Sequence, residues 1–203
     1  MNTISEIVQK TYSLYPSCKG PTKQEGYKYL VTNLLEICPG NILEIGAFEG
    51  KSTRIFLEIA KSFNKKVYVV DPWNGQQEGT DQAYKKFLEN THDFSNLEVI
   101  KQSSQNPVTI NVISNMSLAF CLIDGLHKKS AVTSDIQGVQ KALFSQGVIL
   151  VDDVRDLYGC LASAHEIMDA VNECQNEDWK HLISPPDWLG SCLINEGKNL
   201  CDF

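Results

Sequence analysis

Short, almost unbroken apolar runs alternate with amphipathic segments along most of this 203-residue chain. Strands that are buried on both faces of a parallel sheet have this continuous apolar character, whereas the covering helices repeat their apolar residues every three to four positions. The apolar runs predict strands at residues 41–45, 67–70, 97–100, 118–123 and 148–151. Helices are predicted at residues 4–8, 22–38, 51–63, 81–89 and 108–113, through Val132, Ile136, Val139 and Leu143, and through Leu161, Ala164, Ile167, Met168 and Val171.

Two further strands are predicted at residues 179–184 and 191–195, and the loop between them is too short for a helical crossover. Such a connection requires an antiparallel hairpin. The pattern therefore predicts an α/β fold: a doubly wound, Rossmann-like sheet, mostly parallel with one antiparallel C-terminal strand, with helices on both faces. We expect one domain, with a helical N-terminal extension or lid at residues 1–38 and the core at residues 41–203. Thr22 is expected to cap the second helix and Pro39-Gly40 to stop it.

The charge balance excludes several classes of partner. Lys and Arg number 18 against 25 Asp and Glu, so the formal net charge is −7. A chain without a Lys/Arg cluster lacks the phosphate contacts of nucleic-acid binders, and no apolar run is long enough for a membrane span or signal peptide. The 7 cysteines include no C-x-x-C pair, which favours free thiols in a reducing compartment. We expect a cytoplasmic protein that binds neither nucleic acid nor membrane.

A glycine-containing loop, LEIGAFEGKST at residues 43–53, follows the first predicted strand. A phosphate-binding P-loop has four residues between its glycines, but only three separate Gly46 from Gly50. The alternative is a nucleoside cradle, in which Gly46 allows a tight turn and Gly50 a close approach to the ligand. Glu44 would then meet a cation, such as the ammonium group of a methionine moiety, or hydrogen-bond donors. Asp71 would accept hydrogen bonds from two ribose hydroxyls, unless Asp71-Pro72 is simply a turn.

The segments LEIGAFEGKST, VVDPW, FCLIDGLH and VILVDD, in this order, resemble the class I S-adenosylmethionine-dependent methyltransferases. The likeness is greatest to the divalent-metal-dependent O-methyltransferases, which include catechol-type, macrolide-sugar and cephalosporin-tailoring enzymes. It covers residues 41–154 well and the flanks only in outline. The resemblance implies S-adenosylmethionine as the cofactor. The cofactor-binding residues that we expect are Glu44, Gly46, Ala47, Gly50 and Ser52 near the methionine part, Asp71 at the ribose, Trp73, Gln102 and Ser103 around the adenine, and Asp124.

Three carboxylates end the fourth and fifth parallel strands. Asp124 follows one strand, and Asp152 and Asp153 follow the next. Carboxylates that meet at one edge of a sheet repel one another unless a cation lies between them, and oxygen ligands suit Mg²⁺ or another hard divalent ion. The sequence thus predicts a metal site, which the family resemblance favours. The alternative is that Asp124 forms a turn and the Asp152-Asp153 pair caps the following segment.

His127 lies three residues after Asp124, where the resemblance places the general base of the sugar-tailoring enzymes. An ordinary imidazole pKa near ~6.5 suits a base at neutral pH, and a cation would acidify the substrate hydroxyl further. Lys128 is a lesser alternative. We expect methyl transfer to the hydroxyl of a small sugar, natural-product or catechol-like acceptor, with acceptor walls formed by the N-terminal helices and the 185–188 loop. The resemblance makes a homodimer plausible.

Other functions stay open at this point. One is a metal-independent class I methyltransferase in which Asp152 and Asp153 are structural. The others are a P-loop-like nucleotide-binding enzyme and a nucleoside-binding protein without catalytic activity. Chelator sensitivity separates the first from the metal-dependent enzyme, and preference for the sulfonium cofactor over ATP excludes the P-loop function.

Overall fold

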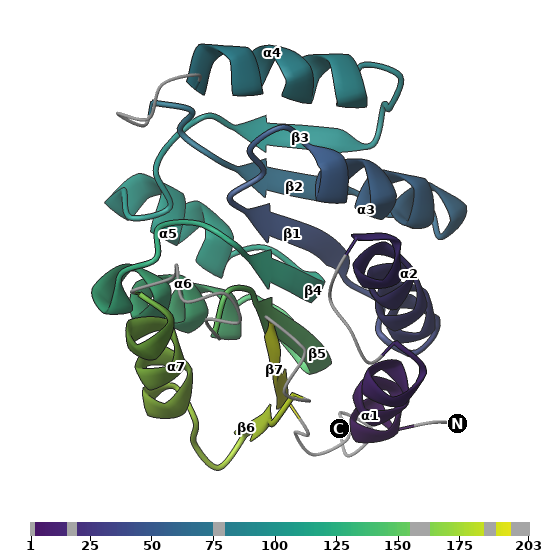
Figure 1. Ribbon diagram of the computed structural model, residues 1–203, viewed down its shortest axis with the longest axis vertical. Coiled ribbons are helices and arrows are strands. Elements are labelled where there is room, and N and C mark those ends of the chain that lie inside the picture. Colours follow the sequence, from purple (N-terminus) through teal and green to yellow (C-terminus); the bar gives the residue numbers. More distant parts are fainter. Residues whose placement is uncertain (1–2, 16–19, 75–79, 155–162, 185–189, 196–203) are drawn as a thin grey trace.

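The computed structural model describes residues 3–15, 20–74, 80–154, 163–184 and 190–195. Within these residues the strands are β1 (Asn41–Ile45), β2 (Val67–Val70), β3 (Leu97–Ile100), β4 (Leu118–Ile123), β5 (Leu143–Val151), β6 (Trp179–Leu182) and β7 (Ser191–Asn195). They form one sheet in the order β3-β2-β1-β4-β5-β7-β6 (Figure 1). Strands β1 to β5 pair in parallel, and β7 runs antiparallel to both β5 and β6. The predicted fold class, including the one reversed strand, is confirmed.

The strand order reverses beside β1, because β2 pairs with one edge of β1 and β4 with the other. Ligands of doubly wound sheets bind in the crevice at this switch point, beyond the carboxyl ends of the strands. Ile45, Val70 and Ile123 stand at the same level across β1, β2 and β4. The residues that follow them, with those after β5, form what we call the carboxyl edge of the sheet.

Helices cover the sheet on both faces (Figure 1). The helices are α1 (Ile4–Leu14), α2 (Gly20–Ile37), α3 (Lys51–Ser62), α4 (Thr80–Thr91), α5 (Pro107–Ser114), α6 (Lys129–Gln140) and α7 (Ala164–Glu173). One hydrophobic core lies under α1 to α4 and a second lies under α5 to α7. No helix in the described part is long and apolar enough to cross a bilayer.

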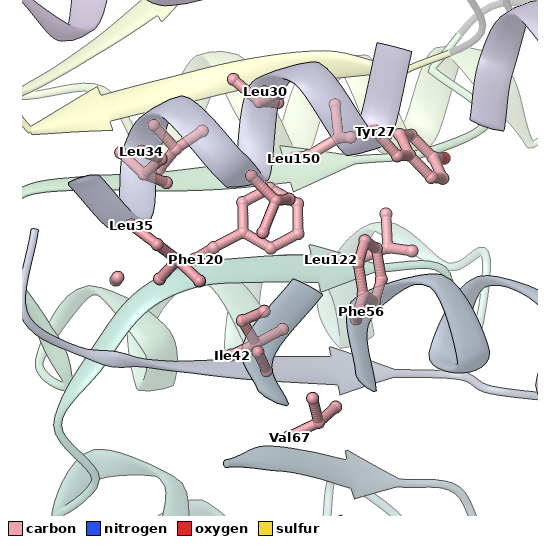
Figure 2. Close-up of a cluster of buried hydrophobic side chains, with 14 of the residues drawn as sticks. Tyr27, Leu30, Leu34, Leu35, Ile42, Phe56, Val67, Phe120, Leu122 and Leu150 are labelled. Carbon is pink, nitrogen blue, oxygen red and sulfur yellow. The ribbon is translucent and has the colours of Figure 1, made fainter. Parts of the chain in front are cut away.

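Helix α2 is anchored on the sheet by an apolar stripe. Figure 2 shows its buried Tyr27, Leu30 and Leu34 facing Phe120 of β4 and Leu150 of β5. All five side chains are less than 5% exposed. A stripe that removes this much apolar surface from water stabilises the helix by several kcal/mol, at about 1.5–3 kcal/mol per large side chain. The N-terminal extension is therefore part of the core.

Two local predictions are wrong. Leu143 belongs to β5, where it pairs with Leu118, and not to the preceding helix, which ends at Gln140. The four-residue spacing from Val139 imitates a helical repeat, but the ladder with β4 decides the conformation. Thr22 lies inside α2, which already begins at Gly20, so it is not the cap. Leu161 and the 185–188 loop lie outside the described residues.

Candidate active site

The loop between β1 and α3 begins with a close backbone contact. Gly46 has φ +88°, and a Cβ there would lie 2.0 Å from the carbonyl oxygen of Asp124. Gly46 thus allows the β1 and β4 strand ends to approach each other, as the predicted tight turn requires. Gly50, with φ +77°, precedes α3, and the space for a Cβ there is taken by Phe87 of α4. In the structure, Gly50 therefore permits a close approach to α4.

Asp71 organises the same loop from the end of β2. Its Oδ2 accepts hydrogen bonds from the backbone N–H groups of Ala47 (2.9 Å) and Phe48 (3.0 Å), and its Oδ1 accepts from that of Trp73 (2.8 Å). The Trp73 indole donates to the Phe48 carbonyl at 2.8 Å. A P-loop needs free N–H groups in its loop to cradle a phosphate, and here two of them are already bound to a carboxylate. This arrangement disfavours the P-loop function.

Glu44 lies beneath the loop and is fully buried. The hydroxyls of Ser52 and Thr53, in the first turn of α3, both donate to its carboxylate. Burial raises the pKa of Glu44 to about 7, although these two hydrogen bonds act in the opposite direction. Glu44 was expected to meet either a cation or hydrogen-bond donors. The described residues supply hydrogen-bond donors, the hydroxyls of Ser52 and Thr53.

Two adjoining cavities open along the carboxyl edge. One, of about 490 Å³, lies against Asp71, Trp73, Ser103 and Asp124. The other, of about 580 Å³, is lined by Ala47, Ser52, Asp124 and His127. Both are also lined by Gly46 and by the exposed side chains of Phe48 and Leu126. Most of the predicted cofactor residues and His127 thus line these two cavities, which share Asp124, whereas Glu44, Gly50 and Gln102 line neither.

The predicted adenine residues fall into two groups. Trp73 and Ser103 line the 490 Å³ cavity, whereas the side-chain oxygen of Gln102 accepts a hydrogen bond from Thr109 at 3.1 Å. The cavity is also lined by Ser104 and Gln105, which were not among the predicted site residues. Gln105 donates at 2.8 Å to Asp135 of α6, whose pKa burial raises to about 7. Ser104 and Gln105 directly follow the predicted Gln102 and Ser103. Their position just after β3 is the sequence signal that could have identified them.

Three of the predicted catalytic and metal-binding residues form a cluster. The Nε2 atom of His127 is 3.6 Å from Asp124 Oδ1 and 3.6 Å from Asp153 Oδ2. The possible ligand atoms of these residues all lie within 4.8 Å of one another. Asp153 adopts φ +55°, an uncommon backbone conformation that Asp tolerates better than most residues. The strand-end prediction therefore brings Asp124 and Asp153 together, with His127 between them.

Asp152 faces a different set of partners. It is 3% exposed, and its Oδ2 forms an ion pair with Lys23 of α2 and accepts a hydrogen bond from the Tyr27 hydroxyl at 3.3 Å. Its Oδ1 accepts from the backbone N–H of Asp153 at 3.0 Å. Neither Lys23 nor Tyr27 was predicted to contact Asp152, and no local pattern signals a contact that spans more than 120 positions.

The cluster of Asp124, His127 and Asp153 contains two carboxylates but only one imidazole. Burial raises the pKa of Asp124 to about 6, and the neighbouring Asp152 and Asp153 add to this rise. Burial and then Asp152 also raise the pKa of Asp153. The carboxylate of Asp124, 3.6 Å away, raises the pKa of His127 above its ordinary value, so the protonated imidazole is a weaker acid than an isolated one. Carboxylates that shift in this direction favour binding of a cation.

Comparisons with known proteins identify the family and the fold of the chain. The model of one protein family, described as a methyltransferase domain, matches residues 43–154, more than half of the chain. A TDP-rhamnose 3′-O-methyltransferase of calicheamicin biosynthesis is similar in structure, with a TM-score of 0.66 at 12% identity over 98% of this chain and 97% of that one. An O-methyltransferase from Bacillus cereus, solved with SAH, gives 0.60 at 16% identity over 95% and 90%.

A third similar structure is an SAH-bound methyltransferase from Podospora anserina, with a TM-score of 0.57 at 12% identity over 95% of this chain and 88% of that one. The search of curated proteins gives no match. At these identities the solved structures establish the fold, while the family match covers the strand ends from Glu44 to Asp153. The chain therefore belongs to the methyltransferase domain family, with the class I S-adenosylmethionine-dependent methyltransferase fold that its sequence predicted.

Proposed function

We propose that the protein is an S-adenosylmethionine-dependent O-methyltransferase that uses Mg²⁺ or another hard divalent ion and methylates a hydroxyl of a small sugar, natural-product or catechol-like acceptor. The observation that supports this function most directly is the position of His127. This imidazole lies 3.6 Å from two carboxylates and lines the 580 Å³ cavity. A proton acceptor and a candidate cation site therefore lie next to each other, beside the cavity proposed for the cofactor.

The 490 Å³ cavity is the proposed cofactor site. A carboxylate at the end of β2 and a glycine turn at the end of β1 are the features with which doubly wound sheets bind nucleosides. Asp71 and Gly46 supply them here, and Trp73 and Ser103 line the far part of the cavity. Two of the similar solved proteins, from Bacillus cereus and Podospora anserina, contain the demethylated product SAH. Both observations support S-adenosylmethionine as the methyl donor.

The donor set of the cluster fits a hard divalent ion. Asp124 and Asp153 offer carboxylate oxygens, and ligand atoms within 4.8 Å of one another can surround one ion at ligand distances of about 2.0–2.6 Å. Such an ion supplies Lewis acidity, which lowers the pKa of an acceptor hydroxyl. Asp124 and Asp153 would hold the ion, and His127 would stay available to take a proton.

In this proposal His127 would take the proton from the acceptor hydroxyl. Bound S-adenosylmethionine would supply the methyl group, whose bond to sulfur breaks as its bond to the acceptor oxygen forms, leaving S-adenosylhomocysteine. The chain contributes alignment, because the loop that positions the cofactor and the strand end that bears His127 touch at Gly46 and Asp124. The exposed Phe48 and Leu126 border both cavities and provide an apolar wall for the acceptor. A base at this position typically contributes a factor of about 10²–10⁴ to the rate.

One observation favours a second candidate, the metal-independent methyltransferase. Lys23 already pairs with Asp152, so one of the three negative charges at this edge is balanced by the chain itself. The remaining pair, Asp124 and Asp153, would then be balanced by protonated His127 alone. In that case the imidazole is an electrostatic partner and the acceptor needs no acidification by an ion.

A calorimetric titration with S-adenosylhomocysteine tests the proposal, run in Mg²⁺, in chelator, and with ATP in place of the product. We expect tight binding of S-adenosylhomocysteine under both conditions and none of ATP. A methyl-transfer screen of vicinal diols should then give turnover with Mg²⁺ and lose it with chelator. Turnover that survives chelator would establish the metal-independent candidate, and binding of ATP alone would refute both.

A further inference from the structure

Asp135 is a buried carboxyl group that the proposed reaction does not use. It lies on α6, which packs beside α5 on one face of the sheet (Figure 1). The residue is 2% exposed, and its Oδ2 has no hydrogen-bond partner among the described residues. Its Oδ1 accepts a hydrogen bond of 2.8 Å from the side-chain nitrogen of Gln105, which lines the 490 Å³ cavity. Asp135 therefore connects α6 to the wall of the cavity proposed for the cofactor.

The side-chain nitrogen of Gln105 is fully occupied. Besides Asp135, it lies 3.2 Å from the hydroxyl of Ser104 and 3.3 Å from the backbone carbonyl oxygen of Ala131. An amide nitrogen has two hydrogens to donate, and here three acceptors surround it. Turning the amide over would bring its own oxygen against a carboxylate and a backbone carbonyl, and both would repel it. These contacts determine which end of the amide faces α6.

The oxygen of the same amide is the end that is left for a ligand. No described residue donates a hydrogen bond to Gln105 Oε1, although the residue lines the cavity. Gln102 is the opposite case, because its oxygen accepts from Thr109 at 3.1 Å and it lines neither cavity at the carboxyl edge. The wall of the 490 Å³ cavity after β3 thus offers a hydrogen-bond acceptor whose direction is set from α6.

We propose that Gln105 selects the base of the cofactor and that Asp135 is the positioning residue that sets the direction of its amide. This rests on the S-adenosylmethionine site of the proposed function. Adenine carries an amino group, which donates hydrogen bonds, at the ring position where a 6-keto purine carries an oxygen that only accepts them. The Gln105 oxygen accepts from the amino group and repels the keto oxygen. Asp135 acts on this choice through Gln105.

The test compares two ligands by calorimetry on the full chain: S-adenosylhomocysteine and S-inosylhomocysteine, in which a keto oxygen replaces the amino group. The wild type should bind S-adenosylhomocysteine at least about tenfold more tightly, because the keto compound leaves two acceptors facing each other. Equal binding of both compounds would overturn the inference and leave the cofactor class of the proposed function intact. Binding of neither compound would overturn both.

The variants are judged by the ratio of the two dissociation constants, because a merely loosened helix weakens both ligands alike. Gln105→Met should reduce the ratio to less than about threefold, since it removes the acceptor. Asp135→Ala should reduce it to about a third of the wild-type value or less, because the amide is then free to turn. Asp135→Asn keeps an oxygen that can accept from Gln105, so its ratio should stay within about twofold of wild type.

Gln140→Ala is the matched control on the same helix. The Gln140 side chain also donates a hydrogen bond, to the carbonyl oxygen of Cys174 at 2.9 Å, but it does not line the cavity. Its ratio should equal that of the wild type. A folded Gln105→Met protein that keeps the full preference would overturn the role of Gln105. A folded Asp135→Ala protein that keeps it, or a Gln140→Ala protein that loses it, would overturn the positioning role of Asp135.

Discussion

The carboxyl edge of the sheet has two halves that treat their acidic residues differently. At the ends of β1 and β2, Glu44 and Asp71 together accept five hydrogen bonds from hydroxyl and backbone donors of the chain. At the ends of β4 and β5, Asp124 and Asp153 face each other and one imidazole. In the first half, which we call the saturated half, both carboxylates already have hydrogen-bond donors from the chain. The second, the open half, has negative charge left for an added cation.

This difference separates binding from catalysis. Carboxylates that already hold a loop in place preorganise a cofactor site, because no further ordering is needed when the ligand arrives. Carboxylates that repel one another carry a free-energy cost that a cation or a proton relieves. The saturated half is therefore suited to hold a cofactor, and the open half is suited to chemistry that moves a proton.

The largest expected effect is in the open half. His127→Ala should lower kcat by about 10²–10⁴-fold, because the acceptor hydroxyl loses its base. Binding of S-adenosylhomocysteine, measured by calorimetry, should change less than about threefold, since the cofactor cavity belongs to the saturated half. Lys128→Ala is the control and should retain turnover. If Lys128→Ala loses turnover while His127→Ala keeps it, the base is Lys128.

The contact between the halves can be broken at Gly46. An alanine there would have to adopt φ +88° with its Cβ 2.0 Å from a backbone oxygen of Asp124. We expect Gly46→Ala to cost about 3 kcal/mol or more in the free energy of unfolding, from left-handed strain and overpacking, and to abolish cofactor binding. Gly138→Ala on α6 is the control, because nothing lies within 4 Å of its Cβ position. Urea denaturation that ranks the two variants equally would contradict this interpretation.

The substitution Glu44→Gln tests how the buried carboxyl group in the saturated half affects the pH dependence of stability. The pKa of Glu44 rises from 4.5 to about 7 on folding, so the native state holds this proton more tightly than the unfolded chain. Stability in the wild type should therefore fall as the pH rises from about 4.5 to about 7, by roughly 2–3 kcal/mol from this residue. The variant lacks this contribution, so its stability relative to wild type should increase over the same interval. Urea titrations at several pH values measure the free energy of unfolding. If its pH dependence is the same in wild type and Glu44→Gln, this prediction is wrong.

The smallest effects are expected when the same change, aspartate to asparagine, is made separately in each half. Asp71→Asn should destabilise the protein by about 1–2 kcal/mol, because one amide cannot accept the hydrogen bonds of Ala47, Phe48 and Trp73 together. Asp153→Asn should leave the ion-free protein unchanged or stabilise it by up to about 1 kcal/mol at pH 8, because it removes a repelling charge. Thermal unfolding in chelator measures both. Equal destabilisation by the two substitutions would remove the distinction between the halves.

The sequence by itself determined the order of strands and helices, the glycine turn, and the strand ends at which the acidic residues lie. These follow from the apolar period and the alternation of elements, which are properties of neighbouring residues and of a small set of allowed topologies. Because parallel strands end at the same edge, position alone predicted that Asp124, Asp152 and Asp153 meet; the structure brings Asp124 and Asp153 together, whereas Asp152 pairs with Lys23. The shared neighbour of Asp124 and Asp153, His127, follows from its short distance along the chain.

Only the tertiary structure decided which partner each carboxylate takes. Lys23 is far from Asp152 in the sequence, Asp71 binds N–H groups of a loop more than 20 residues away, and Gln105 donates to Asp135 on another element. Leu143 was assigned to the wrong element for the same reason, because its pairing with Leu118 is invisible in a local repeat. A periodic pattern records which face of an element is buried, whereas a hydrogen bond depends on ångström-scale distances that exist only once the elements have packed.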